Sequence, residues 1–250
     1  MKILRYEKGG LEFYGFLDGQ AIVRAEGDLS IGLTPTKHQD SLAEVRLLAP
    51  CVPTKGVCIG LNYRDHAMEL GLALPTAPVV FLKPSTSLIG PGDWIDYPEL
   101  SHRVDYEAEL VAVIGKKAKN VLPEQALEYV LGYTCGNDVT ARDLQPKDGQ
   151  WTAAKSFDTF MALGPWIETD LDPSNLKIRA ILNGAQKQSS TTANLIFDVP
   201  HLVSWLSRIM TLLPGDVIMT GTPSGIGPMQ KGDEIAIEIE GIGTLINRVR

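Results

Sequence analysis

Alternation of hydrophobic and polar positions predicts strands along most of the chain. Residues 234–240 place isoleucine at every second position and mostly glutamate between them, a pattern typical of a strand with one buried face. Residues 13–17 and 21–24 flank Asp18-Gly19-Gln20, which predicts a β-hairpin. The apolar run 56–60 predicts a strand that is buried on both faces.

Helical patterns are few and short. A first helix is expected to begin after Asn62, as its N-terminal cap, and to end at Gly71. A second is expected over 123–131, closed by Gly132, and a third over 200–210. Many strands with few helices at irregular intervals favour a β-rich α+β fold, a roll or sandwich, over a doubly wound α/β sheet.

A proline-rich segment at residues 49–55 predicts a boundary between a small N-terminal β domain, residues 1–50, and a main domain, residues 51–250. The net charge of −7 argues against a nucleic-acid surface, which needs clustered lysine and arginine. The N-terminus lacks the apolar run of a signal peptide, and no stretch reaches the length of a membrane span. With three cysteines in apolar surroundings and no metal-type spacing, we expect reduced thiols and a cytoplasmic protein without a membrane partner.

Two glutamates open an otherwise apolar strand predicted at 105–115. Because side chains alternate along a strand, Glu107 and Glu109 share one face, with Cβ atoms about 7 Å apart. Val111 and Val113 continue that face, and the opposite face is apolar throughout. The strand therefore runs from a polar end into a region buried on both sides, and the two carboxylates sit at the border.

A third carboxylate, Asp138, ends another strand-like run at 130–136. Three carboxylates without histidine or cysteine would form an all-oxygen site that suits Mg²⁺, Mn²⁺ or Ca²⁺ better than Zn²⁺. A glutamate pair on a strand is also typical of a solvated face, and spacing alone does not bring Asp138 to Glu107. From the residues alone, both interpretations stay open.

Other polar side chains also allow both a functional and a purely structural interpretation. His66 and Glu69 stand three residues apart on the predicted helix, where they form either a general base for a water molecule or a surface ion pair. Lys83 and Lys155 follow apolar segments, from which each either reaches solvent or faces a substrate. The glycine-rich run 220–227 lacks a P-loop signature and is either a tight turn or a loop that holds an anion.

Seven motifs, in this order and spacing, favour the functional interpretations of these residues over the structural ones. They are residues 60–69 (GLNYRDHAME), 81–85 (FLKPS), 105–110 (DYEAEL), 132–134 (GYT), 137–143 (NDVTARD), 155–159 (KSFDT) and 214–223 (PGDVIMTGTP). Together they resemble the fumarylacetoacetate hydrolase family from about residue 50 to the C-terminus. The resemblance implies a mixed β-sandwich roll and a homodimer.

The resemblance also implies roles for the acidic residues and the histidine. Glu107, Glu109 and Asp138 match the family's ligands for Mg²⁺ or Mn²⁺. His66 and Glu69 match its water-activating pair, carried on a segment that closes over the substrate. The carboxylates at the burial border are thereby expected to be metal ligands.

Five further polar residues match positions of the family's active site. Lys155 corresponds to a catalytic lysine, Gln145 to an active-site amide and Thr222 to a contact with the substrate carboxylate. Lys83 and Arg142 are expected to bind substrate as well, although their roles vary among family members.

The resemblance also implies an activity on 2-oxo acids, through an enolate that the metal stabilises. We expect hydrolysis of a C–C bond in acylpyruvate-like substrates, with oxaloacetate decarboxylation or tautomerisation and hydroxymuconate-type isomerisation as alternatives. Leu61 is shared with isomerase-type members, whereas residues 150–160 are more similar to hydrolase, decarboxylase and tautomerase members. Outside enzymes, the alternatives are a metal-dependent dicarboxylate-binding protein and a purely structural dimer.

Overall fold

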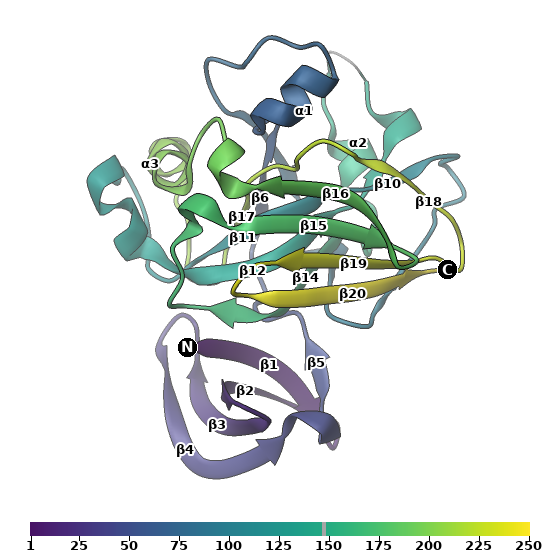
Figure 1. Cartoon of the computed structure of the whole chain (residues 1–250). Helices are drawn as coiled ribbons and strands as arrows, with labels where there is room; N and C mark the ends of the chain where they lie inside the picture. Colours follow the sequence, from purple (N-terminus) through teal and green to yellow (C-terminus); the bar gives the residue numbers. More distant parts are fainter. Residues whose placement is uncertain (147–148) are drawn as a thin grey trace.

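The computed structural model describes residues 1–146 and 149–250, which form three sheets within these ranges (Figure 1). The large sheet has the order β4 (Gly32–Ser41), β3 (Ala21–Asp28), β2 (Leu11–Asp18), β1 (Lys2–Lys8), β14 (Met161–Glu168), β12 (Val130–Asp138), β11 (Ala108–Ile114), β17 (Val217–Met219), β6 (Gly56–Gly60) and β7 (Val79–Lys83), with β5 (Arg46–Leu48) beside β1 and β8 (Leu88–Ile89) beside β14. The cover sheet has the order β16 (Ala185–Thr191), β15 (Lys177–Leu182), β19 (Glu234–Ile239), β20 (Gly243–Val249) and β9 (Trp94–Ile95). The third, small sheet has the order β13 (Thr140–Ala141), β10 (Val104–Tyr106) and β18 (Gly227–Met229).

Helices are short and lie outside the sheets. The α-helices are α1 (Arg64–Glu69), α2 (Thr152–Lys155) and α3 (Val199–Ile209), and the 3₁₀ helices are η1 (Leu42–Glu44), η2 (Ser85–Ser87), η3 (Pro123–Tyr129), η4 (Arg142–Leu144), η5 (Pro173–Asn175) and η6 (Thr192–Asn194). In the part of the chain that the structure describes, none of them has the length and apolar character that a membrane span requires. The predicted β-rich class is confirmed.

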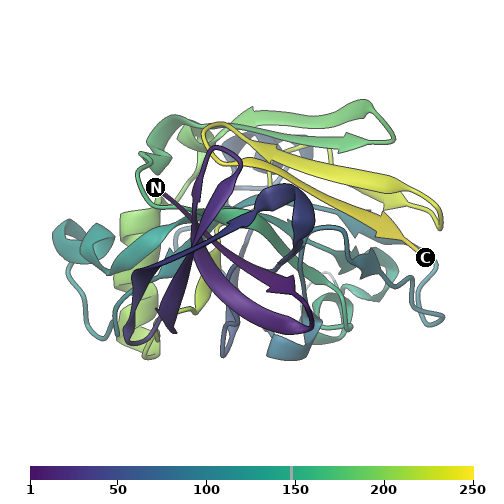
Figure 2. The ribbon, with the colours of Figure 1, turned by 90° about the horizontal axis from the view of Figure 1, so that it is seen from below.

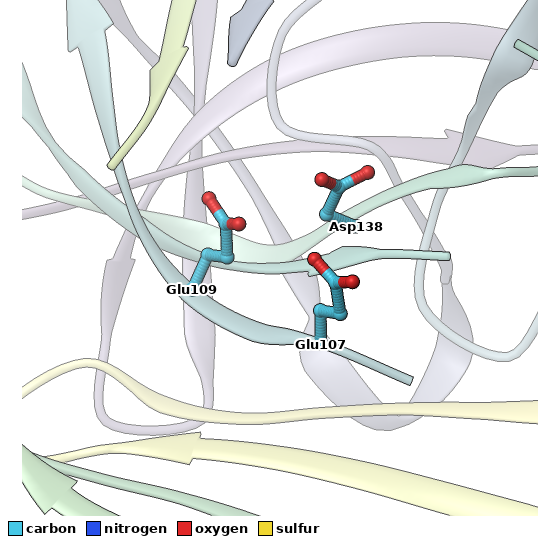
Figure 3. Close-up of side chains that lie close together, drawn as sticks. All are labelled: Glu107, Glu109 and Asp138. Atoms are coloured by element: carbon cyan, nitrogen blue, oxygen red, sulfur yellow. The ribbon is translucent and has the colours of Figure 1, made fainter. Parts of the chain in front are cut away.

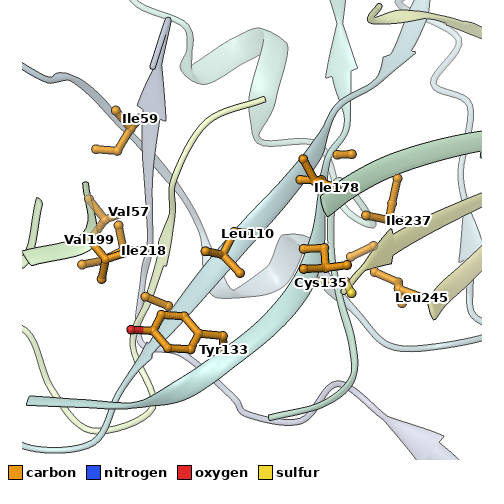
Figure 4. Packing of buried hydrophobic residues seen from close by; sticks show 14 of the residues in the cluster. Val57, Ile59, Leu110, Tyr133, Cys135, Ile178, Val199, Ile218, Ile237 and Leu245 are labelled. Atoms are coloured by element: carbon orange, nitrogen blue, oxygen red, sulfur yellow. The ribbon is translucent and has the colours of Figure 1, made fainter. Parts of the chain in front are cut away.

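The central strand β11 is covered on both faces. Figures 1 and 2 show β15, β16, β19 and β20 forming a layer over β11, β12 and β14, with β1–β5 as a separate group joined through β1 and β14. Leu110 on one face belongs to an apolar cluster that includes Ile178 and Ile237 of the cover sheet (Figure 4). Val111 and Val113 on the other face belong to a second apolar cluster. The predicted burial of this strand on both sides is therefore confirmed.

Several local predictions are also confirmed. The hairpin pairs β2 with β3, and Leu17 faces Ile22 next to the turn. The run 56–60 is β6, and β19 alternates between partly buried and buried positions along its length. The third helix begins one residue earlier than expected, after Asp198, whose side chain accepts a hydrogen bond from the amide of His201.

Asn62 does not cap the first helix. Tyr63 occupies the N-cap position without a side-chain cap, while Asn62 is fully buried. The Asn62 amide nitrogen donates to the carbonyls of Phe197 (2.9 Å) and Thr220 (2.7 Å), and its oxygen accepts from the Phe197 amide (2.8 Å). These tertiary bonds replace the cap because three backbone groups of neighbouring segments would otherwise lack these partners.

The second predicted helix is shorter and of a different kind. Residues Pro123–Tyr129 form the 3₁₀ helix η3, and the chain enters β12 at Val130. Gly132 is a strand residue, where a Cβ atom would lie 2.4 Å from the carbonyl oxygen of Glu168. The glycine that we assigned to a helix end is therefore required by the close approach of a neighbouring strand.

Asp40 is the centre of a group of hydrogen bonds and charges in the N-terminal strands. Its buried carboxylate accepts hydrogen bonds from Tyr6 (2.6 Å) and Arg24 (2.9 Å), and Lys8 Nζ lies 3.0 Å away. Burial alone would raise the Asp40 pKa, but these hydrogen bonds outweigh it and hold the pKa well below its usual range. The resulting stability is present above the unfolded-state pKa of about 3.9 and is lost as the pH falls toward the folded-state pKa.

We therefore expect Asp40→Asn to lower the free energy of unfolding at pH 7 by roughly 2 kcal/mol, because it removes the charge from a buried, cation-paired group. Denaturant unfolding between pH 7 and pH 3 should show a smaller acid-induced loss for the variant than for the wild type. Asp18→Asn, at the exposed hairpin turn, is the control and should leave both quantities unchanged. Equal pH dependence of Asp40→Asn and wild type would contradict the assignment.

Candidate active site

Three buried carboxylates meet where β11 and β12 lie side by side (Figure 3). Glu107 precedes β11, Glu109 is its second residue, and Asp138 ends β12. The antiparallel register sets Ala108 opposite Asn137, and the Asp138 amide donates to the Glu107 carbonyl at 2.9 Å. One oxygen from each carboxylate lies within 4.8 Å of the others. Strand pairing thus supplies the proximity that sequence spacing left open.

The strand is interrupted at Glu107, where the chain passes from the small sheet to the large one. The Glu107 amide donates to Asn137 Oδ1, and the Ala108 amide donates to Gln188 Oε1, both at 2.9 Å. These buried side chains satisfy backbone groups that a continuous ladder would otherwise use. The break lets β10 pair with β13 and β18 while β11 pairs with β12 and β17.

Two cations neutralise Glu107. Lys155 Nζ donates to Glu107 Oε2 (2.9 Å) and to Asp138 Oδ2 (2.7 Å), and the Arg142 guanidinium bonds to Glu107, Asp105 and the Gln145 amide oxygen. Burial alone would raise the Glu107 pKa, but Lys155 and Arg142 outweigh it and lower the pKa to about 2. Glu107 is therefore ionised.

Lys155 stays protonated for the corresponding reason. Burial alone lowers its pKa, but the charges of Asp138 and Glu107 raise it above the usual value. Its ammonium group can donate hydrogen bonds and stabilise negative charge.

Glu109 has no such partner among the described residues. Its Oε2 accepts from the Gly221 amide at 2.8 Å, and no lysine, arginine or histidine in this part of the chain forms an ion pair with it. Burial raises the Glu109 pKa well above its usual range, and the charges of Asp138 and Glu107 add to the shift. The cluster thus lacks positive charge on the Glu109 side.

The donor set fits a hard divalent cation. All three groups offer carboxylate oxygens, the ligands that Mg²⁺ and Mn²⁺ prefer. Asp138 Oδ1 is buried and accepts no hydrogen bond from a described residue, although the Lys83 ammonium lies 2.7 Å away, so it has a lone pair to offer a cation. A dication bound here would also relieve the repulsion on Glu109.

A cavity of about 450 Å³ opens above the carboxylates. Eight of the ten site residues that we predicted line it, namely Glu107, Glu109, Asp138, His66, Lys155, Arg142, Gln145 and Thr222. Its remaining described wall is largely apolar and includes Leu61, Leu70, Leu72, Val79, Phe81 and Trp151. Residues 147 and 148 follow Gln145 and lie outside the described residues. The tertiary structure therefore collects side chains from six separate motifs around one space.

His66 is held in a defined orientation by Glu69. His66 Nδ1 lies 3.0 Å from Glu69 Oε2, and the Gly225 amide donates to the two Glu69 carboxylate oxygens at 3.1 and 3.3 Å. Because the carboxylate accepts from Nδ1–H, Nε2 is left for proton exchange in the cavity. Helix α1 is tethered by Asp65, which accepts from Ser190 Oγ at 2.5 Å.

The glycine-rich run 220–227 holds anions, but those anions belong to the protein. The Gly221 amide donates to Glu109 and the Gly225 amide to Glu69. Both glycines have positive φ, at 102° and 91°, which other residues adopt only with strain. The binding of a ligand anion by this loop, one of the two interpretations that we left open, stays a prediction.

Lys83 differs from its predicted role. Its side chain is fully buried and is absent from the cavity wall. Nζ donates to the carbonyls of Val139 (3.0 Å), Lys155 and Phe160 (2.8 Å) and lies 2.7 Å from Asp138 Oδ1. An ammonium has three hydrogens, and three carbonyls use them, so the predicted direct contact with substrate is not supported by this geometry.

Sequence reasoning missed two buried polar residues that support the site. Gln188 bridges β11 and Thr222, and Asp105 accepts from Arg142 Nε at 2.8 Å. Asp105 stands in a motif that we quoted, where its position two residues before Glu107 could have suggested a role. Gln188 lies in a polar strand segment, 185–191, that offers no such signal.

Two family models and many known proteins match this chain. The fumarylacetoacetate (FAA) hydrolase C-terminal model matches residues 55–250, and an N-terminal model, Rv2993c-like, matches residues 1–50. An uncharacterized protein of Methanocaldococcus jannaschii is 53% identical over 223 residues, covering 89% of this chain and 92% of the relative. The mitochondrial oxaloacetate tautomerase Fahd2a of Rattus norvegicus is 42% identical over 245 residues, covering 92% of this chain and 78% of the relative.

Solved structures show the same fold over the full chain. The 5-carboxymethyl-2-hydroxymuconate delta-isomerase of Mycobacterium smegmatis has a TM-score of 0.93 and 45% identity, covering 100% of this chain and 99% of that one. The maleylpyruvate hydrolase of Sphingobium sp. SYK-6, solved with manganese(II) and pyruvate, has a TM-score of 0.82 and 29% identity, covering 100% and 98%. The match over residues 55–250 and these identities show that the chain belongs to the fumarylacetoacetate hydrolase family.

Proposed function

We propose that this protein is a divalent-metal-dependent enzyme that hydrolyses a C–C bond in acylpyruvate-like 2-oxo acids. The observation that carries the proposal is that the oriented His66–Glu69 pair and the carboxylates of Glu107, Glu109 and Asp138 belong to one cavity. A metal-bound 2-oxo acid and a general base for water are the two requirements of this reaction.

Each group has a distinct part in the reaction. Glu107, Glu109 and Asp138 would hold Mg²⁺ or Mn²⁺, which supplies Lewis-acid stabilisation of negative charge at the 2-oxo end of the substrate. His66 Nε2 takes a proton from water, and the resulting hydroxide adds to the distal carbonyl carbon. Glu69 stabilises the imidazolium that forms. When the C–C bond breaks, its electron pair passes to the pyruvate part as an enolate.

The enolate is then protonated and released. The Lys155 ammonium lies at the carboxylate cluster, where it stabilises the developing negative charge. The His66 imidazolium returns its proton to the enolate carbon. The balance is one acylpyruvate and one water consumed, with one carboxylic acid and one pyruvate formed.

The apolar side of the cavity wall favours a substrate with an uncharged acyl group. Leu61, Leu70, Leu72 and Val79 line this side, and the described lining there offers no lysine or arginine besides Lys155 and Arg142, which are already paired. A second carboxylate placed against this wall would lose its hydration without gaining a partner. Acylpyruvates with apolar acyl groups fit this side better than dicarboxylates do.

A second candidate is tautomerisation or decarboxylation of oxaloacetate, or isomerisation of a hydroxymuconate-type diene. It is favoured by relatives and structures with 42–45% identity that carry tautomerase and isomerase names. These reactions need the same enolate support but no attack by water.

A substrate panel with Mg²⁺ or Mn²⁺ separates the candidates. Release of pyruvate from acylpyruvates supports hydrolysis. Keto–enol exchange or CO₂ release from oxaloacetate, with acylpyruvates left intact, replaces it with the second candidate. Tight binding of oxalate or pyruvate without any turnover would indicate a binding protein. Sedimentation of the same sample tests the homodimer that we also propose.

Glu69→Gln distinguishes the role of the His66–Glu69 pair. The amide cannot stabilise an imidazolium as a carboxylate does, so we expect kcat for hydrolysis to fall by about 10- to 100-fold. Oxaloacetate tautomerisation, which needs no water attack, should change by less than about threefold on the same argument. Equal loss of both activities would contradict this division of roles. Glu99→Gln, on an exposed loop, is the matched control.

A further inference from the structure

Gln188 connects the broken strand to the substrate side of the cavity. It comes from β16 of the cover sheet and is fully buried. Its Oε1 accepts from the Ala108 amide at 2.9 Å, and its Nε2 donates to Thr222 Oγ1 and to the Pro223 carbonyl, both at 2.8 Å. One side chain thus joins the residue between the two glutamates to the predicted substrate contact.

The orientation of this amide is set by the backbone. The Ala108 N–H can only donate, so it requires the oxygen of the Gln188 amide. The Pro223 carbonyl can only accept, so it requires the nitrogen. A flipped amide would face a donor with a donor and an acceptor with an acceptor. The Gln188 nitrogen must therefore lie beside Thr222.

This orientation decides what the Thr222 hydroxyl can do. A hydroxyl has one hydrogen to donate, and here its oxygen already accepts from Gln188. The structure shows no acceptor for the Thr222 hydrogen within residues 1–146 and 149–250, and Thr222 lines the cavity. The hydrogen is consequently available to a ligand, and only to a ligand atom that accepts.

We propose that Gln188 is a positioning residue that fixes Thr222 as a hydrogen-bond donor to an oxygen of the substrate, so that the site selects a carboxylate or carbonyl over an N–H group at that point. The inference rests on the proposed function, since it takes Thr222 to contact the 2-oxo acid. Gln188 itself remains buried behind Thr222.

Pyruvate binding to the Mn²⁺-loaded protein, measured by calorimetry, tests this proposal without requiring turnover. Thr222→Val removes the donor at nearly constant volume, and we expect Kd for pyruvate to rise about tenfold, the effect of losing one hydrogen bond to a charged group. Thr222→Ser keeps the hydroxyl and should bind within about twofold of the wild type.

Gln188→Glu tests the positioning step. The new carboxylate still accepts from the Ala108 amide, but when ionised it has no hydrogen for Thr222 and accepts the Thr222 hydrogen instead. We expect Kd for pyruvate to rise about tenfold, and the double variant with Thr222→Val to bind no more weakly than either single variant.

The outcomes separate this role from a structural one. Additive losses in the double variant, or unchanged binding in Gln188→Glu, would overturn the proposal. If Gln188→Glu does not fold, Thr222→Val still tests the contact that Gln188 is proposed to position, because a lower unfolding midpoint with unchanged Kd would make Thr222 structural and overturn the proposal. Non-additive binding losses without turnover on the substrate panel would leave this inference standing and remove the proposed hydrolysis. Failure of the wild type to bind pyruvate would overturn both.

Discussion

Replacement of Glu109 by Gln is expected to abolish Mn²⁺ binding and turnover while making the metal-free protein more stable. Glu109 is buried beside two other carboxylates and forms no ion pair with a described residue. A neutral amide removes this repulsion and keeps an oxygen for the Gly221 amide. We expect turnover to fall by at least about 1,000-fold, because a metal ligand is lost.

Glu107→Gln provides the matched comparison. It also removes a ligand, so Mn²⁺ binding and turnover should be lost to a similar degree. Its effect on stability should have the opposite sign, because Glu107 neutralises Lys155 and Arg142. We expect the free energy of unfolding of the metal-free protein to fall by roughly 1–3 kcal/mol, and that of Glu109→Gln to rise by about 1 kcal/mol.

Two measurements on each variant check this contrast. Calorimetric titration with Mn²⁺ reports the metal site, and denaturant unfolding in the presence of a chelator reports the stability of the metal-free protein. For a chain of this size, a change of 1 kcal/mol corresponds to about 2–4 °C in Tm. Retained Mn²⁺ binding in Glu109→Gln would remove that residue from the site. Equal destabilisation by both variants would contradict the charge assignment.

Lys83→Met is expected to destabilise the protein strongly, although the Lys83 side chain does not line the cavity. Methionine fills a similar volume but leaves three buried carbonyls without a donor and Asp138 without its nearby ammonium. Removing one partner of a buried charge pair costs about 3–5 kcal/mol. The folding equilibrium constant should therefore fall by about 100- to 4,000-fold.

The activity of this variant distinguishes support from substrate binding. Lys83 holds the carbonyl of Lys155, so we expect a lower kcat through displacement of Lys155 and little change in KM. A raised KM with unchanged stability would restore the direct substrate contact predicted from the sequence. Lys116→Met, which removes an exposed lysine just after β11, is the control and should leave both stability and activity unchanged.

Local patterns predicted the regular strands and the third helix, because alternation and helical spacing report directly which face of an element is buried. They failed at residues whose partners come from elsewhere in the chain. Asn62 has the chemistry of a helix cap, but its amide bonds to Phe197 and Thr220. Gly132 follows a helical pattern, but a neighbouring strand carbonyl makes glycine necessary there.

The sequence by itself determined the β-rich class, the family resemblance and the residue types of a metal-dependent site. These features depend on side-chain chemistry and short-range periodicity, which the order of residues carries directly. Only the tertiary structure brought Asp138 to Glu107 and Glu109, since strand pairing joins segments that are 29 or more residues apart in the numbering. The tertiary structure also shows that Lys83 lies behind the cavity wall and that Gln188 lies beside Thr222. These positions depend on the packing between sheets, because that packing determines which hydrogen-bond partners the buried polar groups find.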